Sequence, residues 1–599
     1  MNDTDLFFFG VTTVRSYYQA DSGQKTRLLS WKHHDLTFIG SIFDSIENRI
    51  SITLLPREDG LIVNRPVFQP KEVNAIISST APLLEELDGW ILMLQQAPDA
   101  LTRYYPNVQG AYHRLKAGLG SSPDVLLRWI TVPAYKPKKV LIASIDGMSD
   151  SQMVDQDIIA PLLKTTEPAE SWGEAVITPG HVHSETQWDQ ILQALAAGNT
   201  LVFAPGLDKV WVVDTVTYRQ RSIESPQTEI SVRGPEDAFN EVILTQMNQL
   251  RQRILDPHLH FQQLTLGIRQ NTTVAVAYLA GVANPALVAT CLDRLEAIKI
   301  SGHANATLIA GLIRDHPRSI FPTVRSTERV DLACWNLLAG KVVILVDGDP
   351  FVLIAPASLA DFYRTAMDYS DAWYDTSFVR IIRLMAWIFG VYFPALYIAL
   401  TQVNPNLVPA SLLILTLGDH AGLPFSPFVE AILMILVVEI LREAALRLPK
   451  AMSTTIGTVG AIVIGTAVVK AGFVSPQIIV VITLTALSFF SVPVYELTGT
   501  WRIINLIMLI TATVLGILGI MAATIFMAGL LMSMTSFGAP YLVPTAPCRI
   551  EDWKDSLIRF PWASIHTHLT TPRPLNTTWN KTEISHEPAH LKKSQDYRR

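Results

Sequence analysis

Cysteine is scarce in this chain of 599 residues, which has only Cys291, Cys334 and Cys548, widely separated. An odd number of scattered cysteines without a CxxC pair argues against a disulfide framework and against a structural zinc site. The net charge of −6 does not suggest a protein that binds nucleic acid. The first residues, Met-Asn-Asp-Thr-Asp, contain neither a basic region nor an apolar core. We therefore expect no secretory signal peptide and an N-terminal region that stays in the cytoplasm.

The motifs of common enzyme classes are also missing. The sequence has no GxxxxGK[ST] phosphate loop, no GxGxxG after a strand, no HExxH and no GxSxG. His181, His183 and Glu185 have the chemistry of metal ligands, but they lie in a polar loop and lack a distant partner, so we interpret them as solvated side chains. The sequence thus offers no candidate catalytic, cofactor-binding or metal-binding residue.

Charge is rare in residues 380–535, which contain five strongly apolar stretches. A helix that crosses a membrane needs about 20 apolar residues. We predict spans at 381–402, 425–446, 453–472, 476–498 and 503–534. The last stretch, with Gly516 in its middle, is either one long tilted helix or a broken pair, and Pro394 and Pro493 are expected to kink their spans. A shorter apolar piece, 408–418, is predicted to be re-entrant or interfacial.

The distribution of basic residues predicts an orientation. Basic residues flank the first span and follow the second: Arg380, Arg383, Arg442, Arg447 and Lys450. The loop 403–424 has no lysine or arginine, so the positive-inside rule places the N-terminal region inside and this loop outside. The basic tail should also lie inside, yet five crossings would place it outside. Either one stretch does not cross, or the last stretch crosses twice.

Four charged side chains belong to the second predicted span or its end: Glu430, Glu439, Arg442 and Glu443. Glu439 and Arg442 are three residues apart, and Glu443 and Arg447 are four apart, so both pairs can form on one helical face. The alternative roles are an ion pair that anchors the helix end and part of an ion path. Glu430 has no basic partner nearby in the sequence, and it is the candidate for an ion path or a subunit contact.

The part before the spans contains two matching patterns. An apolar run followed by glycine, a polar turn and a helical pattern occurs at 140–146 and again at 274–280, and a predicted strand–turn–strand hairpin occurs at 200–213 and again at 342–355. The aligned positions are Val140 with Val274, Gly147 with Gly281, Asp150 with Asn284, Val154 with Val288, and Gly206 with Gly348. We infer two related α/β subdomains; chance similarity of short apolar strands is the alternative.

The predicted fold class is α+β with an α-helical membrane part: a cytoplasmic α/β region of two related subdomains, followed by an α-helical transmembrane bundle. The predicted domains are an unassigned extension at 1–135, subdomains at 138–225 and 272–358 with a linker helix region at 226–271 between them, an interfacial elbow at 359–379, the transmembrane domain at 380–538 and a basic cytoplasmic tail at 539–599. The elbow is proposed because its many aromatic rings favour the headgroup level of a membrane.

Six stretches, which occur in order between residues 138 and 548, resemble the A subunit of bacterial spore germination receptors, the GerA family. They are EISVRGPEDAF (229–239), LRQRILDPHL (250–259), STERVDLACWNLLAGKVVILVDGDPFVLIAP (326–356), LPFSPFVEAILM (423–434), EILREAALRLPKAM (439–452) and SFGAPYLVPTAP (536–547). The motif residues that carry the resemblance are Arg233, Gly234, Pro235, Arg253, Asp256, Pro257, Glu328, Arg329, Asp347, Gly348, Pro424, Pro427, Arg447, Pro449, Phe537, Gly538, Pro540 and Tyr541.

The resemblance implies a protein of the inner spore membrane that is not an enzyme and needs no cofactor. It implies a homo-oligomer that works with a transporter-like B subunit and a lipoprotein C subunit, forming a cation channel that opens when nutrients trigger germination. A paralogue of the same family is associated with the dipicolinic acid channel and amplifies the germination signal, and the sequence does not separate these two roles. A small-molecule transporter and a scaffold are further alternatives, although a transporter usually shows a repeat within its membrane region.

Overall fold

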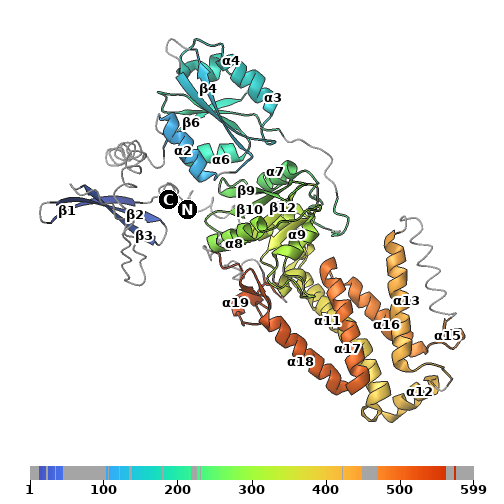
Figure 1. Cartoon of the computed structure of the whole chain (residues 1–599). Helices are drawn as coiled ribbons and strands as arrows, with labels where there is room; N and C mark the ends of the chain where they lie inside the picture. Colours follow the sequence, from blue (N-terminus) through green and yellow to red (C-terminus); the bar gives the residue numbers. More distant parts are fainter. Residues whose placement is uncertain are drawn as a thin grey trace, which may run out of the picture. The chain divides into compact units, whose positions relative to one another are not determined.

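The computed structural model describes most of the chain from Arg103 onward (Figure 1), and every structural statement below concerns the described residues. Those with side chains are 103–104, 107–120, 122–133, 138–178, 181–217, 225–229, 231, 233–420, 422–447, 468–556, 558–561 and 572–574, except for a few side chains within these ranges. The strands β1 (Thr13–Asp21), β2 (Gln24–His33) and β3 (Leu36–Asp44) form an antiparallel sheet. Most of the predicted third span, up to residue 467, lies outside the described residues.

Contacts between residues divide the chain into two compact units, which we describe separately. The first unit consists of Met1–Arg221 and Met247–Gln262, and the second of Ser222–Gln246 and Gln263–Arg599.

The first unit contains a five-stranded sheet in the order β4-β5-β7-β8-β6, with antiparallel pairing throughout. Its elements are α2 (Val108–Gly118), β4 (Val125–Val132), β5 (Lys138–Ile145), α3 (Ser151–Met153), the π-helix η3 (Val154–Ile159), α4 (Ala160–Leu162), η4 (Ala169–Ser171), α5 (Trp172–Ala175), β6 (Val182–Glu185), α6 (Trp188–Ala196), β7 (Thr200–Phe203) and β8 (Val210–Val213). Alternate side chains of β5 pack on opposite faces: Leu141 contacts the cluster that includes α2 and α6, and Ile142 contacts the cluster that includes η3 and α4. Burial on both faces explains why the central strands β7 and β8 are short apolar runs.

The second five-stranded sheet has the order β11-β13-β12-β10-β9. Its elements are α7 (Ile243–Arg253), β9 (Leu259–Leu266), β10 (Thr272–Leu279), α8 (Pro285–Glu296), α9 (Ala306–Ile313), β11 (Arg325–Thr327), α10 (Val330–Leu338), β12 (Val342–Val346) and β13 (Val352–Ala355). Read from its β9 edge, the second sheet has the order β9-β10-β12-β13-β11. In both sheets the strands that come first, second, fourth, fifth and third in the chain therefore lie side by side in that order. The shared order supports the inferred relationship between the two subdomains.

The turns and helix starts that align between the two subdomains in the sequence are also equivalent in the structure. Both predicted hairpins are confirmed, as β7–β8 and β12–β13. Asp150 and Asn284 each cap the helix that follows the second strand of their sheet, accepting hydrogen bonds from backbone N–H groups of the first turn. Gly206 and Gly348, in the two hairpin turns, have positive φ angles of 87° and 82°, a conformation that favours glycine.

The remainder of the second unit is mainly helical. Its elements are η5 (Leu359–Phe362), η6 (Met367–Tyr369), α11 (Trp373–Ile398) with its π-helical continuation η7 (Ala399–Val403), η8 (Pro405–Leu407), α12 (Ala410–His420), α13 (Pro427–Arg447), α15 (Val468–Lys470), α16 (Pro476–Phe490), α17 (Tyr495–Leu515), α18 (Ile517–Ser533), β14 (Thr535–Ser536), β15 (Ala539–Pro540) and α19 (Ile550–Trp553). Among the described helices, two are long and apolar enough to cross a membrane, Trp373–Val403 and Glu496–Leu515. The apolar helices α16 and α18 are shorter.

Two predicted span boundaries are wrong. The break between the fourth and fifth spans was expected at 499–502, but α16 ends at Phe490 and α17 begins at Tyr495. Pro493 therefore lies in the turn between two helices and kinks neither, because a turn tolerates the missing N–H. The last apolar stretch is a broken pair: Gly516 separates α17 from α18 with φ 64° and ψ −140°. A Cβ atom there would lie 2.0 Å from Oδ1 of Asn404.

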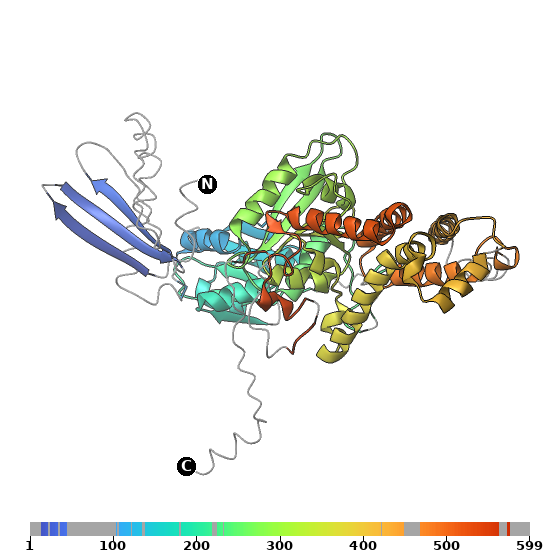
Figure 2. The same cartoon turned by 90° about the horizontal axis from the view of Figure 1, so that it is seen from below.

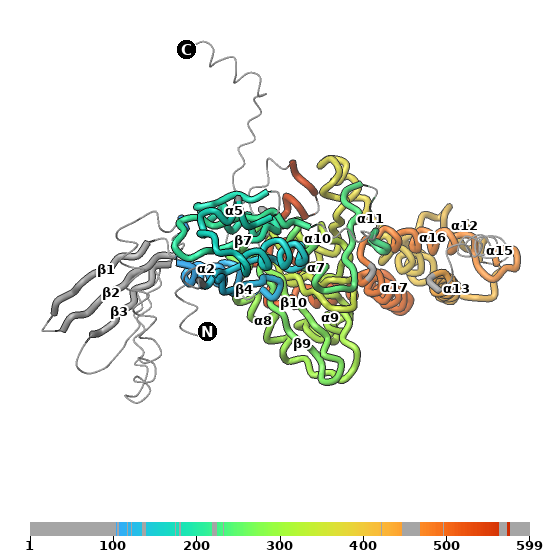
Figure 3. The backbone as a smooth tube through the Cα atoms, turned by 90° about the horizontal axis from the view of Figure 1, so that it is seen from above, coloured from blue at the N-terminus to red at the C-terminus, as the bar shows by residue number. Residues whose placement is uncertain are grey.

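The helices α11, α16 and α17 lie side by side (Figures 1 and 3). A cluster of buried aromatic side chains connects them to the loops around the second sheet: Phe321, Phe362, Tyr363, Trp387, Trp501 and Tyr541. In the view from below, the yellow and orange helices extend to one side of the green second sheet (Figure 2). The junction between this sheet and the helices therefore has its own apolar core.

Candidate functional site

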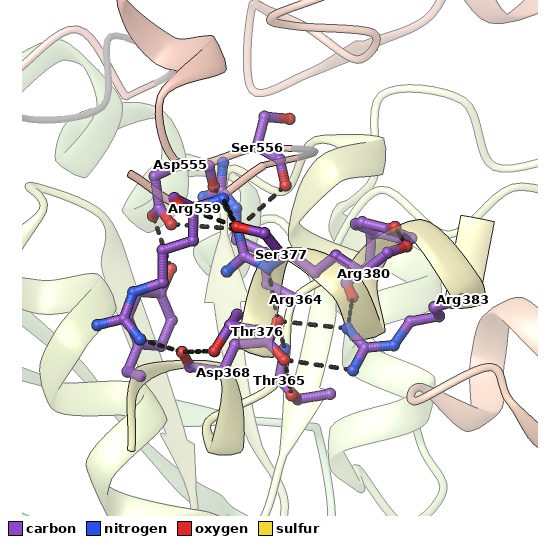
Figure 4. A network of polar contacts seen from close by, with 12 residues as sticks. Arg364, Thr365, Asp368, Thr376, Ser377, Arg380, Arg383, Asp555, Ser556 and Arg559 are labelled. Atoms are coloured by element: carbon purple, nitrogen blue, oxygen red, sulfur yellow. Dashed lines mark hydrogen bonds and ion pairs between the residues drawn. The ribbon is translucent and has the colours of Figure 1, made fainter. Parts of the chain in front are cut away.

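Buried charge is concentrated where the chain leaves the second sheet and enters α11 (Figure 4). The fully buried Arg380 pairs through Nε with Oδ2 of Asp368 at 2.9 Å and through Nη1 with Oδ1 of Asp555 at 3.2 Å. Nη2 of Arg383 lies 3.2 Å from the other oxygen of Asp368. Burial alone would raise the pKa of Asp368, but the two arginines outweigh it and hold that pKa below its ordinary value. This carboxylate is therefore ionised inside the protein.

The segment after α19 is part of the same network (Figure 4). The Tyr369 hydroxyl donates to Oδ2 of Asp555 at 2.8 Å, and Ser377 Oγ donates to the carbonyl of Arg559 at 2.9 Å. The Arg559 guanidinium in turn donates to the carbonyl of Asp371 at 3.0 Å. The end of the helical part is thus bound to the first turns of α11.

A second buried ionic group surrounds Asp361. Nζ of Lys341 lies 2.7 Å from its Oδ1, and a guanidinium nitrogen of Arg364 lies 3.8 Å from the same oxygen. The backbone N–H and the hydroxyl of Ser358 donate to Oδ2 at 2.7 and 2.8 Å. Arg325, on β11, donates to the Asp361 carbonyl. These contacts hold the turn after β13 against the sheet.

The family motif at 229–239 lies along this junction. Glu328 accepts a hydrogen bond from the N–H of Glu229 at 3.0 Å, and Arg329 donates to the carbonyl of Pro235 at 2.8 Å. Nη1 of Arg233 lies 3.3 Å from Oδ1 of Asp371.

The next residue, Gly234, has a φ of 108°, and a Cβ atom there would lie 2.6 Å from Ser370 Oγ. A side chain at this position would be strained by the positive φ and would displace the Ser370 hydroxyl, which gives a physical reason for glycine.

The motif at 536–547, at the end of the helical part, contacts the domain that contains the second sheet. Asp315, which follows α9, accepts hydrogen bonds from Thr535 Oγ1 at 2.7 Å and from the N–H groups of Phe537 and Gly538 at 3.2 and 3.3 Å. Pro540 belongs to β15, and the carbonyl of the buried Tyr541 accepts from the N–H of Leu359 at 2.9 Å.

The start of α17 contacts the same domain, through Thr500 Oγ1, which donates to the carbonyl of Ile320, and through an interaction of Glu496 with Ser326. Both ends of the α17–α18 pair therefore meet the second sheet's domain.

The other motif residues are dispersed. Asp256 accepts from the N–H of His258 at 2.9 Å in the turn before β9, a turn that also contains Pro257, while Arg253 ends α7. Asp347 accepts from the N–H of Ile243 at 3.2 Å, and the N–H of Gly348 donates to the carbonyl of Glu241 at 2.8 Å.

Four motif residues bracket α13. Pro427 is its first residue, where proline is tolerated, and Pro424 lies in the turn before it. Arg447 is its last residue; the side chain of Arg447 and all of Pro449 lie outside the described part.

Of the charged residues predicted in the second span, Glu439 and Arg442 form the expected ion pair at 3.1 Å. A second partner, Arg502 on α17, lies 2.9 Å from Glu439. These side chains and Asn505 border a small cavity of about 30 Å³, and the rest of its lining is mainly apolar. The pairing of Glu443 with Arg447 stays a prediction, because the Arg447 side chain is not described.

Glu430 is fully buried. His420 Nδ1 lies 3.2 Å from its Oε1, and the N–H of Ser475 donates to Oε2 at 2.8 Å. His420 ends the preceding helix, so no helical spacing within α13 connects it with Glu430.

Comparison with known proteins agrees with these motifs. The family described as Bacillus/Clostridium GerA spore germination protein matches residues 113–570. Spore germination protein KA of Bacillus subtilis (strain 168) is 34% identical over 78% of this chain and 87% of its own length, and spore germination protein B1 of the same organism is 36% identical over 76% and 95%. The chain belongs to the GerA family of spore germination proteins.

Two further similarities concern parts of the architecture. The uncharacterized membrane protein YfkQ of Bacillus subtilis (strain 168) is 31% identical over 70% of this chain and 83% of its own length. Its name and the two long apolar helices together indicate membrane association. The crystallised N-terminal domain of the A subunit of the Bacillus megaterium spore germinant receptor GerK3 is 27% identical, with a TM-score of 0.35, over 43% of this chain and 97% of that domain.

Proposed function

We propose that this protein is the A subunit of a nutrient germinant receptor in the inner spore membrane, and that it is not an enzyme. In this proposal, copies of the chain assemble with a transporter-like B subunit and a lipoprotein C subunit into a ligand-gated cation channel. The observation that carries the proposal is that ionisable side chains lie in apolar helices. Such side chains are costly in a membrane unless they serve an ion pathway or pair with a partner. Glu430 and the Glu439–Arg442–Arg502 group are these side chains.

The proposed membrane arrangement has six crossings. They are α11, α13, the predicted span that begins at 453, α16, α17 and α18. An even number places the sheets and the C-terminal tail on the same side, which we assign to the cytoplasm. This arrangement is supported by the α17–α18 pair, since α17 begins beside Ile320 and α18 leads into the hairpin held by Asp315. The predicted domain boundaries, from the extension at 1–135 to the tail at 539–599, are part of the same proposal.

The exposed Cys548 offers a direct test of this orientation, because Cys291 and Cys334 are buried. A membrane-impermeant maleimide is expected to label Cys548 in inverted membrane vesicles and not in right-side-out vesicles. The Cys548→Ser variant, which should stay unlabelled in both, is the control. Labelling in right-side-out vesicles alone would contradict a cytoplasmic C-terminal tail.

The channel proposal predicts that Glu439→Gln slows nutrient-triggered cation flux by about tenfold in liposomes that hold all three subunits. Without the carboxylate, two guanidinium groups that both contact Glu439 would face each other in a low-dielectric site, where like charges repel strongly. Glu236→Gln makes the same chemical change at an exposed position and should leave the flux unchanged.

Two results would contradict parts of this proposal. One is wild-type flux through a normally assembled Glu439→Gln complex, which would remove this residue from the pathway. The other is the lack of nutrient-dependent flux through the assembled wild-type complex, which would overturn the channel itself.

A further inference from the structure

The helices α11, α12, α13 and α16 meet around Glu430 through side chains that form hydrogen bonds. Besides its contact with Glu430, the ring of His420 lies with Nε2 3.3 Å from the hydroxyl of Tyr397 on α11. That hydroxyl lies 3.3 Å from Oε1 of Gln477, on α16. The sequence Tyr397–His420–Glu430–Ser475 is therefore a continuous chain of polar contacts across α11, α12, α13 and the cap of α16.

The burial of Glu430 makes its charge state important. A buried carboxylate is stable only when it is paired, well hydrogen-bonded or protonated. In the part of the chain that the structure describes, the ion-pair partner of Glu430 is His420, whose side chain is 16% exposed. Histidine is also the residue whose charge ordinarily changes between pH 5 and 8. A protonated His420 would thus give the buried carboxylate a positive partner at 3.2 Å.

The described groups around the pair add no fixed positive charge. Tyr397 faces it from α11, and Asp419 precedes His420 on α12 and accepts from Gln477 Nε2 at 2.9 Å. From α16 and its cap come the neutral Gln477 and Ser475. Lys470, on α15, is exposed. Among the described residues, a protonated His420 is therefore the side chain placed to act as a counter-charge for Glu430.

The helix α12 depends on these polar contacts for its position. Thr416 is its one buried residue, whereas its large apolar side chains are exposed: Leu412, Ile414, Leu415 and Leu417. Its side-chain hydrogen bonds with other helices are made by its last two residues, Asp419 and His420. Few apolar contacts and an anchor at one end are the features of an element that can move separately from its surroundings.

We propose that Glu430 and His420 form a proton-binding site that holds the end of α12 against α11, α13 and α16. With the proton bound, imidazolium and carboxylate form an ion pair and α12 is docked. When the proton leaves to water, Glu430 loses its counter-charge and α12 is released. The inference deepens the proposed function, because it makes α12 a proton-controlled element of the channel, and it rests on the membrane placement of the helices.

A spin label on α12 tests the proposal without nutrient, partner subunits or flux. The label is attached to a cysteine at Leu415, which is 58% exposed, in a Cys548→Ser background of the full chain in detergent. We expect the mobile fraction of the label to rise by about threefold or more between pH 5.5 and pH 8, as the docked population decreases. The same label at Leu312, on α9, should not respond to pH.

Three variants decide the assignment. Glu430→Gln and His420→Gln should remove the pH response, and Asp419→Asn should keep it. His420→Arg supplies a charge that does not titrate in this range, so its label should stay immobile at every pH. A pH-independent label in the wild-type background, or a response that survives in Glu430→Gln or His420→Arg, would overturn the site. Since the assay measures no conductance, a failure of the channel proposal would leave its result unchanged.

Discussion

Replacing Arg380 with methionine is expected to lower the free energy of unfolding by about 3–5 kcal/mol, the usual cost of leaving one partner of a buried ion pair behind. Arg380 is fully buried and contacts both Asp368 and Asp555, as well as the carbonyl groups of Asp555 and Ser556. Methionine fills much of the space but leaves the Asp555 carboxylate and two carbonyl groups with fewer donors. The apparent Tm of the purified full chain in detergent should fall by about 5 °C, since a given loss of free energy shifts Tm less in a large protein.

Two other arginines provide matched controls for this measurement. Arg383→Met removes a partner of Asp368 while Arg380 stays in place, so its effect should be smaller. Arg128→Met removes an ion pair with Asp155 in which both side chains are more than half exposed, and surface pairs contribute roughly 0–1 kcal/mol. If Arg380→Met is as mild as Arg128→Met, the buried network does not stabilise the junction.

Asp361→Asn is expected to have a similarly large effect, because it leaves the fully buried Lys341 ammonium without its carboxylate. The expected loss is again about 3–5 kcal/mol of unfolding free energy. Lys341→Met combined with Asp361→Asn removes both charges and should recover a large part of that loss, since a buried pair is often replaceable by uncharged residues. A double-mutant cycle in apparent Tm measures this coupling, and additive effects of the two substitutions would contradict it.

The Asp361 carboxylate should also make the stability of the protein fall at acid pH. Burial alone would raise the pKa of Asp361, but Lys341 and Arg364 outweigh it, so the pKa in the folded protein lies below the ordinary value. Its contribution is therefore fully present above the unfolded-state pKa of about 4 and is lost as pH falls further toward the folded-state pKa. Below pH 4, the apparent Tm of the wild type should decrease more steeply than that of Asp361→Asn. Parallel curves would show that another carboxylate dominates the acid limb.

Local patterns in the sequence were sufficient for much of the architecture. The hairpins β7–β8 and β12–β13 followed from apolar runs around a glycine turn, and the equivalence of Asp150 with Asn284 followed from the alignment of the two patterns. The motifs alone were specific enough for the GerA family, and the match to residues 113–570 confirms it. The pair of Glu439 and Arg442 was predictable because residues three apart share a helical face.

Boundaries and distant partners were not predictable in this way. Hydropathy did not locate the turn between α16 and α17, because the residues on both sides of it are apolar and Pro493 fits a turn as well as a kink. The partners of Glu430 and Glu439 come from other helices, namely His420, Ser475 and Arg502. The rule that side chains three or four residues apart are neighbours applies within one helix, so it does not predict a partner on another helix.

What the sequence by itself determined, then, is the class of the main apolar elements, the repeated order of the hairpins and the family. These depend on periodicity, turn chemistry and capping, which act over a few neighbouring residues. Only the tertiary structure decided that Arg380 meets Asp555 and that both ends of the α17–α18 pair return to the second sheet's domain. The physical reason is that an ion pair between residues far apart in the chain forms only after the packing of whole helices has brought them together.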